Sequence, residues 1–364
     1  MTKTSHGEDL KKAEQVKKKK EIREPIVFKS VDDGLDTALT HLKNIQGRKW
    51  LGLDTGYPSL NYRLNGLRGL TIIGSQPNSG KTAFILNIML NMLKQGVQVI
   101  LINKDMGEMD IYMRVFQILL KLEYNNFKDC KGNDGTDYTY ESMVADIQEH
   151  QGLFKNFYIS NEWDDMSLFR TVRALRDNDK PIIVFIDYLQ CISIDSTSYM
   201  SENQEDKKRI IAIKKIQKEL AIPFVCVTEA RKPSNNKDKN KNLNWTHGMG
   251  DIMGTAMITY VADAVLLMRQ RVVSDDDDSE IPLQERARLK DNSISFIDLN
   301  IAKVRDGGLK GEILYEYYWR KNIFVERSEY DAPNQDTKKD IKKKKDVETV
   351  QMDGVDSEIV KSIF

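Results

Sequence analysis

The chain has 364 residues, and its 55 lysines and arginines are balanced by 55 aspartates and glutamates, so any attraction to nucleic acid must come from local patches rather than from net charge. Three cysteines without a CxxC pair and only four histidines argue against a disulfide framework and against zinc sites. No apolar run approaches the roughly 20 residues of a membrane span, and the lysine-rich start lacks the apolar core of a signal peptide, so we expect a cytoplasmic protein.

Both ends of the chain are expected to be disordered tails. Residues 1–30 are rich in lysine and poor in large apolar side chains, and residues 329–364 are similarly charged. Solvated tails are the simplest interpretation. Two alternatives stay open: a basic tail that adds salt-sensitive attraction to phosphates, and a docking peptide at the final SEIVKSIF.

Residues 51–328 are expected to form one large domain in which short apolar runs alternate with segments of helical period. The expected strands are 70–74, 97–103, 156–160, 181–187, 223–229 and 262–268, and the expected helices are 83–94, 108–122, 167–176 and 204–220. This order predicts an α/β fold, with a mostly parallel central sheet and helices on both faces. Residues 294–326 instead predict two strands joined by a glycine-containing turn, added antiparallel at the sheet edge.

The stretch GSQPNSGKT, between the first expected strand and the first expected helix, has the ending of a phosphate-binding loop. A strand, a tight loop and a helix start place backbone N–H groups and a positive helix end around one point, as a polyphosphate requires. Lys81 is expected to contact the β- and γ-phosphates, and Thr82 to present its hydroxyl to Mg²⁺. Ser75 stands where the pattern has its first glycine. The residues expected to bind the nucleotide are Ser75, Gln76, Pro77, Asn78, Ser79, Gly80, Lys81, Thr82 and Ala83.

Acidic residues at or just beyond the ends of expected strands complete the candidate site. Asp187 ends one strand at the carboxyl edge of the sheet, where a carboxylate can hold Mg²⁺ or its water. Asp105 is a candidate to orient or deprotonate the attacking water, and Glu108 is its competitor. Glu229 ends another strand and is a candidate sensor of the γ-phosphate. A helix-capping role for Glu108 and a solvated strand end for Glu229 are the alternatives.

Several spaced blocks resemble the ATPase domain of DnaB-type hexameric replicative helicases, which has a RecA-like P-loop fold. They are the loop and its approach LDTGYPSLNYRLNGLRGLTIIGSQPNSGKT, then NKDM followed by Arg114, then IDYLQ, GTAMITYVADAVLLM and AKVRDG. Their order makes the resemblance more specific than the loop alone. It covers about residues 31–326, and within it residues 31–50 resemble a linker helix that packs on the adjacent subunit. Too few residues precede Val31 to form the family's amino-terminal, primase-engaging domain.

The resemblance implies a role for each matched residue, with ATP and Mg²⁺ bound. Asp105 would activate water and Asp187 would serve Mg²⁺, while Lys303 and Arg305 would reach the nucleotide of a neighbouring subunit. A solvent-facing strand pair is the alternative for Lys303 and Arg305. The loop after residue 230 lies where RecA-like rings have a pore loop, so its basic residues are expected to grip the DNA backbone, unless they only form a solvated loop. They are Arg231, Lys232, Lys237, Lys239 and Lys241.

Three positions depart from the family pattern and predict slow or altered turnover. Asp105 stands where the family usually has Glu, which shortens the side chain by one methylene. Glu229 stands where the family usually has Gln, and it brings a negative charge near a triphosphate unless Arg231 or Mg²⁺ compensates. Met253 and Gly254 stand where Arg and Glu are usual in a DNA-facing loop.

The resemblance therefore implies an ATP-dependent helicase or translocase acting on single-stranded or forked DNA in replication. It implies a homo-oligomer, most simply a hexameric ring, with a loader, primase or single-strand-binding protein as further partners, in a bacterial or phage-infected cell. One alternative is a RecA/KaiC-like ATPase in recombination or regulation that binds DNA or a partner without unwinding. Another is a nucleotide-binding assembly protein with little hydrolysis.

Overall fold

The computed structural model describes residues 30–176, 180–193, 200–230, 249–252, 256–271 and 293–327. The chain divides into two compact units, Met1–Lys49 and Trp50–Phe364. The expected tails fall almost wholly outside the described residues, as do Met253 and Gly254. Within the described ranges, no helix is both long and apolar enough to cross a membrane.

The first unit contributes helix α2 (Asp32–Ile45) to the described structure. At its start the backbone N–H of Asp33 donates to Ser30 Oγ (3.1 Å), and the N–H of Ser30 donates to Asp33 Oδ2 (2.9 Å). The first bond satisfies a donor at the helix end. Hydrogen bonds from the Ser30 backbone and side chain to the Asp33 carboxylate hold its pKa below the usual value. Four apolar residues recur at the spacing of one helical face and are exposed, whereas Ile45 at the end of the helix is half-buried. They are Val31, Leu35, Leu39 and Leu42.

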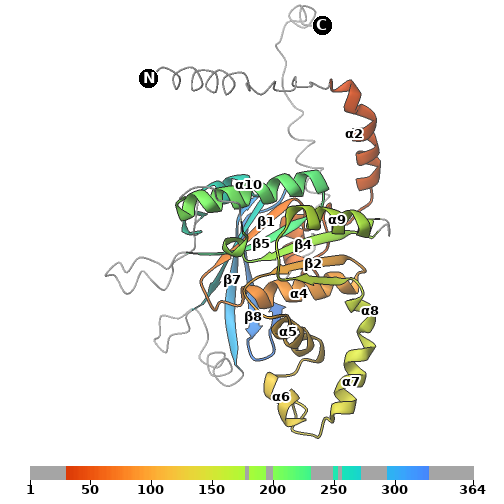
Figure 1. The fold of residues 1–364 in the computed structure, drawn as a ribbon, viewed down its shortest axis with the longest axis vertical. Coiled ribbons are helices and arrows are strands. Elements are labelled where there is room, and N and C mark those ends of the chain that lie inside the picture. Colours follow the sequence, from red (N-terminus) through yellow and green to blue (C-terminus); the bar gives the residue numbers. More distant parts are fainter. Residues whose placement is uncertain are drawn as a thin grey trace, which may run out of the picture. The chain divides into compact units, whose positions relative to one another are not determined.

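The second unit is built on one nine-stranded sheet, in the order β3-β2-β4-β5-β1-β6-β7-β8-β9 (Figure 1). Its parallel part consists of β1 (Leu70–Ser75), β2 (Gln98–Asn103), β3 (Phe157–Ser160), β4 (Ile182–Asp187), β5 (Phe224–Glu229) and β6 (Ala264–Gln270). Every residue of β1, β2 and β4 is buried, as their uninterrupted apolar runs predict. The predicted α/β fold with a mostly parallel sheet is therefore confirmed.

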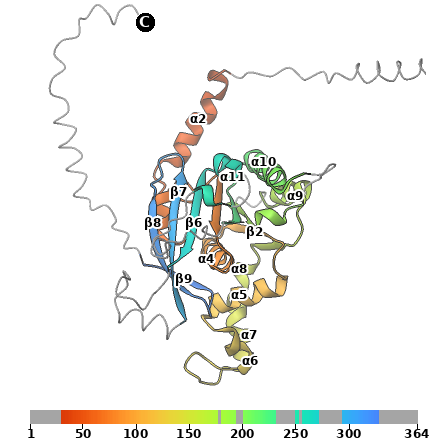
Figure 2. The ribbon, with the colours of Figure 1, turned by 90° about the vertical axis from the view of Figure 1, so that its left-hand side faces the viewer.

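The antiparallel end of the sheet has one more strand than the sequence predicts. β7 (Ile294–Val304) pairs antiparallel with β6, β8 (Gly311–Tyr318) pairs with β7, and β9 (Ile323–Glu326) pairs with β8. Figure 2 shows β6, β7 and β8 side by side. The expected antiparallel addition is confirmed. It contains three strands rather than the two predicted, because a short turn at residues 319–322 separates β8 from β9.

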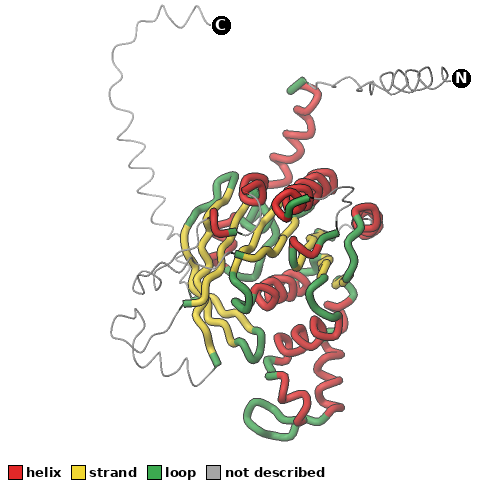
Figure 3. Tube along the Cα trace, turned by 60° about the vertical axis from the view of Figure 1, so that its left-hand side comes forward, coloured by secondary structure: helices red, strands yellow, loops and turns green. Residues whose placement is uncertain are grey.

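Helices cover both faces of the sheet, drawn as red coils on either side of the yellow strands in Figure 3. One apolar core includes side chains of α3 (Pro58–Leu64), α4 (Lys81–Lys94), α5 (Glu108–Leu120) and α8 (Gln151–Phe154). The other includes side chains of α9 (Asp165–Arg176), α10 (Glu202–Leu220) and α11 (Ala256–Val261). Helices α6 (Tyr124–Asp129) and α7 (Tyr140–Glu149) lie beyond α5 and α8, away from the sheet (Figure 1).

Helix α4, which begins at the phosphate loop, is tied to β9 by buried contacts. Asn87 Nδ2 donates to the carbonyl oxygens of Ala83 (2.7 Å) and Asn322 (2.7 Å), and Asn87 Oδ1 accepts the backbone N–H of Phe324 (3.3 Å). The ring of Phe84 packs edge-to-face on Phe324, with ring centroids 5.1 Å apart. The loop is thus attached to the antiparallel end of the sheet as well as to β1.

Replacing Asn87 by alanine should lower the free energy of unfolding by about 1–3 kcal/mol, because the partner groups at Asn322 and Phe324 stay buried without their hydrogen bonds. Chemical denaturation monitored by circular dichroism measures the loss. Gln95→Ala, at the exposed end of the same helix, is the matched control and should change stability by less than about 0.5 kcal/mol. Equal losses in the two variants would contradict the anchoring role of Asn87.

Candidate nucleotide-binding site

The parallel register brings the predicted site residues to one edge of the sheet. In β1 and β5, Ser75 lies opposite Glu229. In β2 and β4, Asn103 lies opposite Asp187, and Asp105 follows two residues later. Because the carboxyl ends of parallel strands meet at the same edge, a loop after β1 faces acids that are distant in sequence.

The backbone explains why Ser75 is tolerated in the phosphate loop. Ser75 is the last residue of β1, whereas the left-handed backbone occurs at Asn78 (φ 63°) and Gly80 (φ 84°). An added Cβ at Gly80 would lie 2.8 Å from Cε1 of Tyr317, so a larger residue does not fit without movement. The hydroxyls of Ser75 and Ser79 form a hydrogen bond with each other inside the loop. The position that demands glycine is therefore 80 rather than 75.

The amino-terminal end of α4 supplies backbone donors to the loop. The first hydrogen bond of this helix runs from the N–H of Phe84 to the carbonyl of Gly80 (2.8 Å). The N–H groups of Lys81, Thr82 and Ala83 therefore precede the intrahelical ladder and can serve an anion. The Ala83 side chain itself is buried in the apolar core, so only its backbone can contribute.

Lys81 is held over the loop by two backbone oxygens. Its Nζ donates to the carbonyls of Ser75 (3.1 Å) and Gln76 (2.9 Å). Burial lowers the pKa of this lysine, and the nearby negative charges of Glu229, Asp187 and Asp105 oppose that shift. The ammonium is thus placed where the loop would receive a phosphate.

Thr82 and Asp187 form a hydrogen-bonded pair in the lining of the site. Thr82 Oγ1 donates to Asp187 Oδ2 at 2.7 Å. Burial raises the pKa of Asp187; the Thr82 hydrogen bond and the charges of Lys81 and Arg114 counteract it, and the charge of Asp105 adds to it. A hydroxyl and a carboxylate are the oxygen ligands that Mg²⁺ takes in proteins, so this pair fits that ion.

A cavity of about 400 Å³ joins these groups. Its walls include Gly80, Lys81, Thr82, Asp105, Asp187 and Glu229. Glu108 is not among the residues that line it; that residue lies exposed in the first turn of α5, as expected of a helix-capping charge. The geometry therefore favours Asp105 over Glu108 as the carboxylate next to a bound phosphate.

The sequence patterns gave no site role to four residues that line this cavity: Met106, Arg114, Tyr188 and Tyr317. Arg114 of α5 lines it, and its sequence signal was its place after NKDM in the blocks that resemble the DnaB family. Tyr317 of β8 also lines it, and only the tertiary pairing of β8 places it there. Among the described wall residues, three carboxylates face the two cations Lys81 and Arg114. This excess of negative charge favours a divalent cation in the site.

A larger cavity, of about 860 Å³, adjoins the first and shares Asn78, Met106, Arg114 and Tyr317 with it. Trp319, Arg320 and Asn322 line its other side. The two cavities together are large enough for a nucleotide, with the phosphates at the loop.

The structure does not bring Lys303 and Arg305 to this edge. They lie at the far end of β7, which runs antiparallel to β6, so they neighbour the amino end of β1. Arg305 N donates to the carbonyl of Asp263 (2.9 Å), and Asp263 N donates to the carbonyl of Leu70 (2.8 Å). The length of β1, roughly 16 Å for six residues, separates this edge from the phosphate loop. The predicted DNA-binding residues Arg231, Lys232, Lys237, Lys239 and Lys241 lie outside the described residues.

Comparison with known proteins decides the family. Residues 52–344 match the family described as DnaB-like helicase C terminal domain. The chain belongs to this family. A probable plasmid replicative DNA helicase of Chlamydia psittaci is 30% identical over 227 residues, which cover 60% of this chain and 47% of that protein. The replicative DNA helicase DnaB of Helicobacter pylori (strain ATCC 700392 / 26695) is 24% identical over 248 residues, which cover 66% of this chain and 49% of that protein.

Solved structures agree on the fold of the DnaB-like domain. One of them, described as an ATPase domain, superimposes with a TM-score of 0.65 at 20% identity, covering 82% of this chain and 99% of that structure. A DnaB-like replicative helicase, described together with its interactions with primase, gives a TM-score of 0.61 at 19% identity, covering 87% of this chain and 71% of that one. The RecA-like fold is thereby confirmed. The chain spans about half the length of the curated relatives that it matches.

We expect Mg²⁺-ATP to stabilise the DnaB-like domain and the replacement of Asp187 by asparagine to remove this stabilisation, because the amide does not supply a charged ligand. The variant should also lose the part of the pH dependence of folding stability that comes from Asp187. Because burial raises the pKa of Asp187, the folded domain binds this proton more readily than the unfolded chain, so stability falls as pH rises from the ordinary aspartate pKa through the raised value.

Thermal unfolding from pH 4 to pH 8, with and without Mg²⁺-ATP, measures both effects. Thr82→Ser, which keeps the hydroxyl, is the control and should retain both the ligand effect and the pH profile. An Asp187→Asn variant still stabilised by Mg²⁺-ATP to the wild-type extent would contradict the assignment.

Proposed function

We propose that this chain is an ATP-dependent DNA helicase or translocase of the DnaB type, which moves along single-stranded DNA in replication and unwinds the duplex ahead of it. The observation that supports the proposal is that the candidate nucleotide-binding residues and Arg305 lie at opposite edges of one sheet. Lys81, Thr82 and Asp187 gather at the carboxyl edge, whereas Arg305 lies at the other edge. Family membership supports a helicase over a RecA/KaiC-like ATPase that does not unwind.

The residues of the carboxyl edge act on the nucleotide of their own subunit. The N–H groups at the start of α4 and the ammonium of Lys81 bind the phosphates, and Thr82 with Asp187 holds Mg²⁺. The ion, when bound, supplies positive charge to the phosphate oxygens. Asp105 orients and deprotonates the attacking water, and Glu229 senses the γ-phosphate. The short side chain of Asp105 and the added charge of Glu229 make turnover slow.

Arg305 and Lys303 act on a neighbouring copy. Neither can approach its own phosphate loop, because the length of β1 lies between them. A cation supplied across an interface stabilises the charge that develops in phosphoryl transfer, so hydrolysis depends on assembly. We infer a homo-oligomeric ring, most simply a hexamer, in which each interface combines the two edges.

Helix α2 suits the same assembly. Its apolar face is exposed, with Val31 at 89% and Leu35, Leu39 and Leu42 at 46–53% of full exposure. Burying such a face requires a partner, and a second copy of this chain would supply it. The linker contact that the sequence predicts is thus part of the proposal.

A forked duplex tests the function. The wild-type chain should displace one strand in the presence of ATP and Mg²⁺, and Lys81→Ala should abolish displacement, because the variant loses the cation that contacts the phosphates. A fluorescence strand-displacement assay measures the rate. DNA-stimulated hydrolysis without displacement would identify a non-unwinding ATPase instead, and tight ATP binding with negligible turnover would identify a nucleotide-binding assembly protein.

A mixing experiment tests the division of the site. Lys81→Ala and Arg305→Ala proteins should each be inactive alone. Mixed under conditions that allow assembly, they should regain partial ATPase activity, because an interface between an intact loop and an intact arginine then forms. ATP hydrolysis is measured over a series of mixing ratios. Failure to recover at every ratio, with mixed oligomers present, would contradict action in trans.

A further inference from the structure

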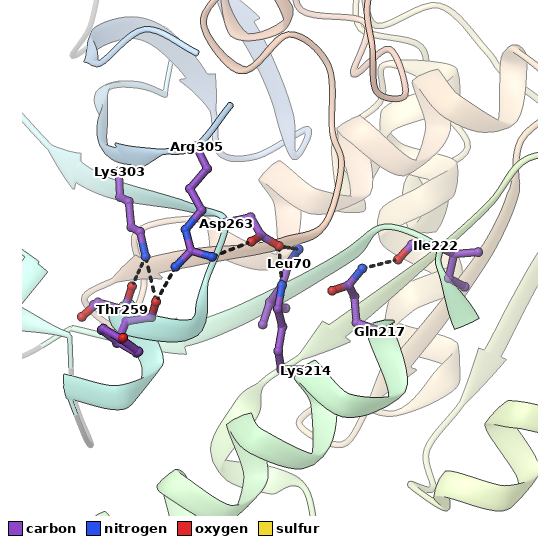
Figure 4. A network of polar contacts seen from close by, with 9 residues as sticks. Leu70, Lys214, Gln217, Ile222, Thr259, Asp263, Lys303 and Arg305 are labelled. Atoms are coloured by element: carbon purple, nitrogen blue, oxygen red, sulfur yellow. Dashed lines mark hydrogen bonds and ion pairs between the residues drawn. The ribbon is translucent and has the colours of Figure 1, made fainter. Parts of the chain in front are cut away.

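Lys303 and Arg305 are held at their edge of the sheet by the end of α11 (Figure 4). Lys303 Nζ donates to the carbonyls of Thr259 (2.7 Å) and Tyr260 (2.9 Å). Arg305 Nη2 donates to the carbonyl of Tyr260 at 3.0 Å. Carbonyls in the last turn of a helix have no intrahelical partner and carry partial negative charge. The two cations therefore occupy the natural cation site of this helix end.

Asp263 is the only carboxylate drawn in this network, and it joins four elements there (Figure 4). Its Oδ1 accepts a hydrogen bond from Arg305 Nη1 (3.2 Å). Its Oδ2 accepts the backbone N–H of Leu70 (2.7 Å) and a hydrogen bond from Lys214 of α10. Asp263 itself lies between α11 and β6, so its carboxylate connects α10, β1, β6 and the end of β7.

The carboxylate of Asp263 has little room to move. Gly69 has φ 61°, and a Cβ added there would lie 2.2 Å from Asp263 Oδ2. The absence of a side chain at position 69 is therefore what admits the carboxylate next to β1. With its backbone N–H and C=O bonded to Leu70 and Arg305, Asp263 is fixed at both ends.

Charge reinforces this arrangement. Burial by itself would raise the pKa of Asp263, but the hydrogen bonds from Lys214 and Leu70 and the charges of Lys214 and Arg305 hold it below its usual value. Burial lowers the pKa of Lys303, and the charge of Arg305 lowers it further while Asp263 opposes the shift. Asp263 is thus an anion that keeps two repelling cations side by side.

We propose that Asp263 is a positioning residue for Arg305, holding the guanidinium in place for the nucleotide of the neighbouring subunit. The proposal rests on the proposed function, in which Arg305 acts in trans. The side chain of Lys214 is 13% exposed to solvent, whereas that of Arg305 is 45% exposed. The carboxylate therefore anchors an arginine that still faces solvent. An arginine held in advance loses less side-chain entropy when the transition state forms. The Arg305 guanidinium is then already ordered when the neighbouring subunit binds.

Asp263→Asn tests this role, because asparagine keeps the size and an acceptor but removes the charge. We expect kcat for ATP hydrolysis to fall about ten-fold, with KM for ATP changed less than about two-fold, since each subunit's own phosphate loop is intact. Thermal unfolding verifies that the variant is folded. Asp306→Asn is the matched control, because it removes the same charge from an exposed side chain next to Arg305, and its kcat should stay within about two-fold of the wild type.

Mixing separates a positioning role from a general loss of structure. Asp263→Asn mixed with Lys81→Ala should recover activity, because the Lys81→Ala subunit presents a well-placed Arg305 to the intact loop of the other. Asp263→Asn mixed with Arg305→Ala should not recover, because no interface then holds a well-placed arginine.

The outcomes distinguish this inference from the function on which it rests. If Arg305→Ala recovers with Lys81→Ala but Asp263→Asn does not, the positioning role is overturned and action in trans stands. An unchanged kcat in Asp263→Asn overturns it as well. If neither pair recovers in mixed oligomers, action in trans fails and the positioning role fails with it.

Discussion

The parallel alignment of β1, β4 and β5 is the constraint on which the rest of this molecule depends. It brings the phosphate loop, Asp187 and Glu229 to one edge of the sheet, although more than a hundred residues separate the loop from either acid. The Thr82–Asp187 hydrogen bond joins the first strand's loop to the end of β4. The site is therefore as rigid as the sheet, because its residues are attached to strands that are buried on both faces.

The antiparallel strands place Lys303 and Arg305 at the opposite edge of the same sheet. β7 returns along β6, so its last residues lie beside the amino end of β1, opposite the phosphate loop. In the proposed function a cation there serves the phosphate of a neighbouring subunit, so hydrolysis would depend on assembly. Asp263 accepts hydrogen bonds from β1 and α10 at the same edge, so it ties this edge to the rest of the sheet.

Much of the fold was predictable from local patterns. The six parallel strands were identified as apolar runs, because strands covered on both faces have no polar alternation. The third antiparallel strand was missed, because β8 and β9 are joined by a turn within a run of aromatic residues. Arg114 and Tyr317 were not assigned to the site, since their approach depends on how α5 and β8 pack rather than on neighbouring residues.

The sequence by itself predicted the candidate phosphate loop and the acids at the same edge of the sheet, because strand, loop and helix start are local patterns and the carboxyl ends of parallel strands meet at one edge. Only the tertiary structure decided which position of the loop requires glycine, which acid faces the cavity, and where Arg305 lies. Those facts depend on long-range contacts: Gly80 against Tyr317, Asp105 in the same cavity as Asp187, and Arg305 against Asp263.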